Sequence, residues 1–240
     1  MNCKLCLKDT PLVSSHIIPE FLYTALYDSK HRFEQISVEP TEHNKYVQKG
    51  LRETLLCVPC EQNLSVLEQY FSKLLKGDVA ARAARGDGHI HLTEVDYCKL
   101  KLFQVSILWR AGVSGLEPFS QVKLGPHEER IRTMLLLNEP GSAAEYGCLM
   151  FSLVSGKEVL AGLVVPPTWT KLAGQRAYRF VFGGLVFIYL VSKTNPPIEI
   201  IGAFAQPDGS ASVRPQQLSE MKYLVAPISQ MRKLGRLAEK

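Results

Sequence analysis

The chain has 240 residues, of which 46% are hydrophobic and 21% charged, so it can bury the core of one large domain or two small ones. Its longest apolar run, residues 181–191, is too short for a membrane helix, and its first residues lack the apolar core of a signal peptide. Both features predict a cytoplasmic protein with no membrane partner. The net charge of +5 agrees with an anionic partner, but it comes entirely from residues 89–240, because acidic and basic residues balance in 1–88.

Short elements are predicted in the first third of the chain. Apolar residues recur at helical spacing over 61–75, and Gly77 is placed to end that helix. The alanine-rich segment that follows is expected to extend a helix as far as the Gly86-Asp87-Gly88 break. We place a domain boundary here, which divides the chain into 1–88 and 89–240. The other elements expected are a strand ending at His16, a helix over 21–27, a long loop or irregular hairpin over 28–50, and a strand or turn over 51–56.

The rest of the chain predicts helices first and strands afterwards. Two helices are expected, over 96–113 and 126–137, and Arg110 within the first is expected to be partly buried and to pair with Glu128 or Glu129. Helices followed by consecutive strands indicate an α+β domain with an antiparallel sheet. We expect this domain to recognise a target, bind a partner protein or form a homodimer. The remaining elements expected are strands over 146–154, 159–165, 178–182, 185–191 and 198–204, and a helix over 229–237.

Four of the six cysteines form two Cys-x-x-Cys pairs, Cys3 with Cys6 and Cys57 with Cys60. Two such pairs can surround one ion tetrahedrally, which is the geometry of structural zinc sites, and four thiolates leave no open position for a substrate. The sequence therefore predicts a structural zinc. Two alternatives stay open: four independent thiols, and a redox role for one pair.

Between the two pairs lies Ser15-His16-Ile17-Ile18-Pro19, and Leu56-Cys57-Val58-Pro59-Cys60 opens the predicted helix. In this arrangement residues 1–76 resemble the HNH endonuclease family, whose ββα-metal core often lies inside a four-cysteine zinc frame. The whole chain is similar to bacterial HNH-like proteins that combine these motifs with a Leu-Trp-Arg helix, here 108–110. The resemblance implies a zinc-binding ββα unit, phosphodiester hydrolysis, most simply of DNA, and a setting such as phage defence.

The resemblance also implies roles for single residues. His16 would be the general base, and one magnesium or manganese ion would steady the charge on the scissile phosphate. Ser15 and Arg52 stand where the family carries a metal ligand and an asparagine, so a carboxylate on the helix, Glu61 rather than Glu68, is the candidate ligand for this ion. His43 and Asn63 are the weaker candidates.

Contacts with nucleic acid require lysine and arginine near the scissile phosphate. Lys45, Lys49 and Arg52 are the candidates, and a small basic cluster near the C-terminus is interpreted as a solvent-facing surface. The alternative function is a zinc-stabilised module that has lost catalysis and binds nucleic acid or protein. In that case His16 would be a strand-end histidine with a structural hydrogen bond.

Overall fold

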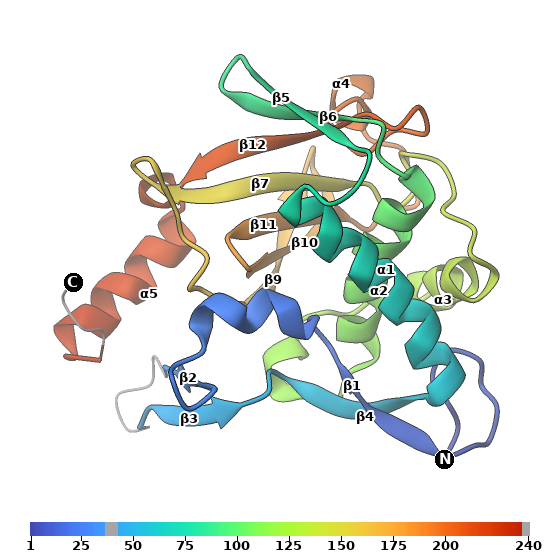
Figure 1. Ribbon diagram of the computed structural model, residues 1–240, viewed down its shortest axis with the longest axis horizontal. Coiled ribbons are helices and arrows are strands. Elements are labelled where there is room, and N and C mark those ends of the chain that lie inside the picture. The colour runs from blue at the N-terminus through green and yellow to red at the C-terminus, as the bar shows by residue number, and fades with distance from the viewer. Residues whose placement is uncertain (37–42, 237–240) are drawn as a thin grey trace.

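The computed structural model describes residues 1–36 and 43–236, and its fold is mixed α+β, as the sequence predicts (Figure 1). A small N-terminal part carries two short two-stranded sheets and a long helix, and an eight-stranded sheet occupies the rest. Within the described residues, no helix is long and apolar enough to cross a membrane.

In the N-terminal part, the two strands nearest to the cysteine pairs are antiparallel partners. β1 pairs with β4, and the long helix α1 follows β4 without a loop (Figure 1). A second hairpin, β2 with β3, lies between them in sequence, so the segment 28–50 is a hairpin in its described residues. The elements are β1 Leu12–His16, η1 Glu20–Leu26, β2 Arg32–Gln35, β3 Lys45–Gln48, β4 Arg52–Cys57 and α1 Val58–Lys76.

The large sheet has the order β5-β6-β12-β7-β11-β10-β9, and β8 pairs with β7 beside this path. Its neighbours are antiparallel except β12 and β7, which are parallel. The strands are β5 Arg82–Gly86, β6 His89–Thr93, β7 Cys148–Ser155, β8 Glu158–Val159, β9 Val165–Leu172, β10 Gln175–Phe182, β11 Leu185–Leu190 and β12 Ala211–Gln217.

Helices lie on both faces of this sheet. The ring of Phe71 on α1 stacks on that of Phe103 on α2 with centroids 4.1 Å apart, and it also contacts Phe187 on β11, at 6.1 Å. A second apolar cluster joins Val181 and Val186 to Leu224 of α5 on the opposite side of the strands. The helices are α2 Tyr97–Val113, η2 Glu117–Phe119, α3 His127–Leu137, α4 Ile198–Ile201, η3 Leu218–Glu220 and α5 Lys222–Lys233.

Four expected elements differ from the structure. The strand expected over 159–165 is replaced by the short β8, Glu158–Val159, and by β9, which starts only at Val165 and continues to Leu172. Residues 82–86 are strand β5 and not a helix, because Asp87 and Gly88 both have positive φ, 50° and 74°, and turn the chain into a hairpin with β6. Residues 198–201 form a helical turn after Pro197 and not a strand, while strand β12 was missed. Helix α5 begins before the expected residue 229, and the expected end at residue 237 lies outside the described residues.

The division at residue 88 falls in the turn of the β5–β6 hairpin. β6 continues into the large sheet by pairing with β12. Side chains from both sides of the division, including Phe71 and Phe103, belong to one buried cluster. The assignment of 1–88 and 89–240 as separate domains stays a prediction.

Candidate functional site

The four cysteines come together at the far end of the β1–β4 pair. Their Sγ atoms all lie within 4.8 Å of one another, and Cys6 Sγ is 3.7 Å from Cys57 Sγ. Cys3, Cys57 and Cys60 are buried and Cys6 is half-buried. The predicted four-cysteine cluster is confirmed, and it could hold a structural metal ion such as zinc.

Each cysteine pair has a different local geometry. The first is a tight turn, in which Leu7 has a positive φ of 61° and its N–H donates to the carbonyl of Cys3 at 2.9 Å. The second pair lies where β4 becomes α1: Cys57 precedes the first helical residue and Pro59 stands in the first turn. The Cys57 N–H donates to Cys3 Sγ at 3.3 Å and joins the two turns.

The backbone also prepares one thiol for deprotonation. Burial alone raises the pKa of Cys3, but main-chain N–H groups of Cys6, Cys57 and Leu5 outweigh it and bring this pKa down to about 7. Burial raises the pKa of Cys57 and of Cys60. A bound cation displaces thiol protons, so Cys3 is prepared as a thiolate, while Cys57 and Cys60 would lose their protons when a metal binds.

The second half of the chain also contacts the cysteine cluster. Arg132 on α3 donates from Nη1 to the carbonyl of Leu5, at 2.5 Å, and pairs with Glu129. Lys4 N donates to the carbonyl of Leu55 on β4, at 3.0 Å. The first turn is therefore held from both sides before any ion binds.

His16 is the last residue of β1 and lies opposite Arg52, the first residue of β4. Arg52 Nε donates to His16 Nε2 at 2.8 Å, and its Nη2 lies 3.3 Å from Nδ1, so the guanidinium reaches both ring nitrogens. Glu20 Oε2 contacts Nε2 as well. The side chain is 12% exposed, so only a small part of the imidazole faces solvent.

The charge state of His16 follows from these neighbours. Burial lowers its pKa below the ordinary 6.5 and the charge of Arg52 lowers it further, while Glu20 acts in the opposite direction. The ring is therefore neutral at pH 7, which is the form that can accept a proton.

Glu20 is the residue that sequence reasoning missed at this place. Its Oε1 accepts from Tyr27 Oη at 2.5 Å and pairs with His31 Nε2 at 3.5 Å. Its Oε2 is buried against Nε2 of His16. The available signal was its position four residues after His16, across the turn that Pro19 starts.

Arg110 is fully buried, where partial burial was expected, and its partner is neither Glu128 nor Glu129. Its Nη1 donates both to Glu68 Oε1 on α1 and to the carbonyl of His16, each at 2.7 Å. The expectation was wrong because α2 packs against α1 and brings Arg110 to Glu68. Glu128 and Glu129 lie in the first turn of α3, after the loop that follows α2. Glu68 is therefore committed to an ion pair next to His16.

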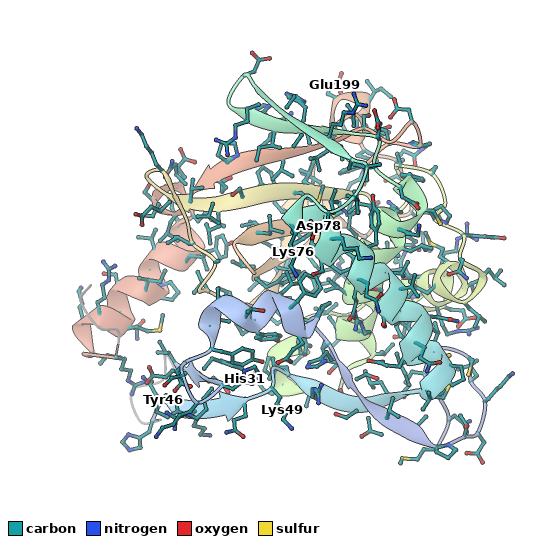
Figure 2. The ribbon with its side chains drawn as sticks, in the orientation of Figure 1. His31, Tyr46, Lys49, Lys76, Asp78 and Glu199 are labelled. Carbon is teal, nitrogen blue, oxygen red and sulfur yellow. The ribbon has the colours of Figure 1, made fainter. Side chains whose placement is uncertain are left out.

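The other predicted site residues are more scattered. Glu61 lies in the first turn of α1 beside the cysteines, and its Oε2 is buried without a hydrogen-bond partner in the described part of the chain. Its role as a metal ligand stays a prediction. Lys45 and Lys49 lie on or next to the exposed β2–β3 hairpin, where Figure 2 shows Tyr46, Lys49 and His31. Of the three basic residues predicted to bind nucleic acid, Arg52 is the one that contacts His16.

Fold and site define a mixed α+β protein that carries a four-cysteine cluster able to hold a metal. Comparison with protein-family models, with curated proteins and with solved structures finds no match for this chain. What these residues do therefore has to be argued from their geometry.

Proposed function

We propose that this protein is a metal-dependent endonuclease of the HNH type that hydrolyses phosphodiester bonds in DNA. One observation carries the proposal: a neutral, mostly buried histidine stands at the end of a strand, opposite an arginine, on a β1–β4–α1 unit whose other end carries the four cysteines. In this reading the cluster holds zinc, because four thiolates suit its tetrahedral coordination.

In the proposed site, the base and the phosphate-binding cation are in direct contact with each other. His16 accepts the proton of the attacking water, and Arg52 binds the scissile phosphate, for which its forked guanidinium is suited. Arg52 must leave the imidazole to do so. Its departure leaves Nε2 in contact with Glu20 alone and removes a charge that holds the pKa of His16 down, so the ring becomes a stronger base when substrate arrives.

A magnesium or manganese ion would stabilise charge on the phosphate and the leaving oxygen. Magnesium commonly uses one or two carboxylates and completes its coordination with water and phosphate oxygens, so a complete protein cage is unnecessary. Glu61 is the carboxylate on α1 that the resemblance implies, and its Oε2 is buried without a hydrogen-bond partner among the described residues, but it lies at the cysteine end of the β1–β4 pair, opposite to the end that carries His16. Glu20, whose Oε2 contacts His16 Nε2, is the second carboxylate to test.

A second function is favoured by one feature of the same site. Arg52 reaches both ring nitrogens of His16, and the four cysteines are the only group of three or more potential metal ligands among the described residues. A zinc-stabilised module that binds nucleic acid or protein without cleaving it would need neither a free imidazole nor a second ion.

The two functions are separated by a cleavage assay with single-stranded DNA, duplex DNA and RNA in the presence of magnesium or manganese. A nuclease predicts cleavage that His16→Ala abolishes, with zinc content and melting temperature retained. His91→Ala, which removes an exposed imidazole from β6, is the matched control and should cleave like wild type. Absence of cleavage on every substrate and with both ions would leave the binding module as the function.

A further inference from the structure

A groove of about 380 Å³ lies along the end of the large sheet, far in sequence from the proposed nuclease residues. β9 is the terminal strand of that sheet, and β10 is its neighbour. The loop between η2 and α3 forms the other wall. The lining residues are Gln121, Lys123, Trp169, Lys171, Arg176 and Tyr178.

The charge in this groove is positive and uncompensated. Lys171 and Arg176 are directly opposite each other in the β9–β10 register, an arrangement that repels. Among the described residues, no carboxylate forms an ion pair with either of them or with Lys123. The field reaches His127, whose pKa is lowered by burial and then by the charges of Lys193 and Arg176. An anion would relieve this repulsion.

An aromatic surface stands next to these charges. Trp169 is directly opposite Tyr178 in the register, two residue pairs along from Lys171 and Arg176, and it is 61% exposed. Lysines on a terminal strand protect it from pairing with another chain, but a large exposed indole has the opposite effect. The exposed indole therefore indicates that a ligand binds here.

The groove is also preorganised. Tyr178 is buried, and its hydroxyl donates to the carbonyl of Lys123 at 2.6 Å and accepts from the N–H of Lys123 at 3.1 Å. Both main-chain groups of the loop residue are thus fixed to β10. Lys123 therefore lies on the same groove as Lys171 and Arg176. Because its loop is already fixed, binding of a ligand carries no entropic cost of ordering the loop.

We propose that this groove binds single-stranded nucleic acid, with a base stacked on Trp169 and the flanking phosphates bound by Lys123, Lys171 and Arg176. Cations that follow a backbone beside an aromatic platform are the general means of binding single strands. A duplex would offer phosphates only, since its bases are already stacked on each other. The proposal also explains why the basic excess of the chain lies in residues 89–240. It does not depend on cleavage at His16.

The test uses the full-length protein in buffer free of magnesium and manganese, with a fluorescein-labelled thymidine 20-mer checked for integrity afterwards. Trp169→Ala is expected to weaken binding about tenfold or more. Lys171→Glu and Arg176→Glu are expected to weaken it and to flatten its dependence on salt. Lys157→Glu, the same charge change in the exposed turn between β7 and β8, should leave binding unchanged.

A second readout comes from the protein itself. Trp109 is fully buried, so quenching of tryptophan fluorescence by the unlabelled oligonucleotide reports on Trp169. Wild-type affinity in all three groove variants, or an equal loss in Lys157→Glu, would overturn the proposal. So would a duplex that binds as tightly as the single strand without quenching. Because no cleavage is measured, a failure here is distinct from a failure of the nuclease proposal.

Discussion

The guanidinium of Arg110 donates a hydrogen bond to the main-chain carbonyl of His16 at 2.7 Å, across 94 residues of sequence. The same Nη1 pairs with Glu68, so a single buried cation on α2 joins the end of β1 to α1. Glu53, next to Arg52 on β4, also accepts from Ser114 Oγ and Gly115 N just after α2. The strand ends that carry the proposed nuclease residues are therefore positioned by a helix from the second half of the chain.

Removing Arg110 should destabilise the protein more than any surface ion-pair change. Arg110→Ala leaves Glu68 and the His16 carbonyl without their donor, and we expect the free energy of unfolding to fall by about 3 to 5 kcal/mol. Urea unfolding followed by circular dichroism measures this. Arg130→Ala, which breaks an exposed pair with Glu145, should lower the free energy of unfolding far less. A similar small loss for both variants would show that the buried pair is not important for stability.

Zinc binding should depend on the four cysteines as a unit. Cys57→Ser is expected to lose the ion and to lower the free energy of unfolding by several kcal/mol, since binding stabilises only the folded chain. Elemental analysis should find about one zinc per wild-type chain. Cys98→Ser, outside the cluster and hydrogen-bonded to Asn138, should keep the metal. Wild-type protein that is metal-free and fully stable would contradict the zinc assignment.

The pKa of His16 should respond in opposite directions to its two charged neighbours. Arg52→Gln removes a charge that lowers this pKa and should raise it, whereas Glu20→Gln should lower it further. NMR titration of the imidazole, assigned with His16→Gln, measures both shifts. Because the unfolded chain takes up this proton nearer pH 6.5 and the folded chain at lower pH, the contribution of His16 to stability is complete above 6.5. It is lost as the pH falls through the folded pKa. Unchanged titration in both variants would show that these contacts do not form in solution.

The carboxylate that binds the catalytic ion can be identified by paired substitutions on α1. Glu61→Gln should weaken activation by magnesium and slow cleavage by orders of magnitude, with little effect on stability, because Glu61 Oε2 has no hydrogen-bond partner among the described residues. Glu68→Gln should instead lower the free energy of unfolding by about 2 kcal/mol, through its bond to Arg110, and change cleavage much less. Cleavage rates measured against magnesium concentration distinguish these effects.

Glu20→Gln completes this series. If Glu61→Gln keeps the wild-type response to magnesium while Glu20→Gln loses it, the ligand is the carboxylate beside His16. If neither substitution changes the response, no carboxylate at either position binds the ion.

Local sequence was sufficient for features that arise from neighbouring residues. The cysteine spacing predicted the metal-binding cluster, because each Cys-x-x-Cys turn presents two thiols whatever surrounds it. Helical periodicity predicted α1 and α2, and Gly77 ends α1 in the left-handed conformation as expected. The Asp87-Gly88 turn was also a local signal, but the alanines before it favoured a helix and the hairpin was missed.

Only the tertiary structure decided which charged groups meet. Arg110 pairs with Glu68 because of how α2 crosses α1, Glu20 reaches His16 because the chain folds back after Pro19, and Lys171 faces Arg176 because of the β9–β10 register. A shift of one residue in that register would move one of these cations to the other face of the sheet. Arg110 and Glu68 are 42 residues apart and meet only because two helices pack together, whereas the other two pairs are close in sequence and depend on the conformation of the turn between them, which composition does not specify.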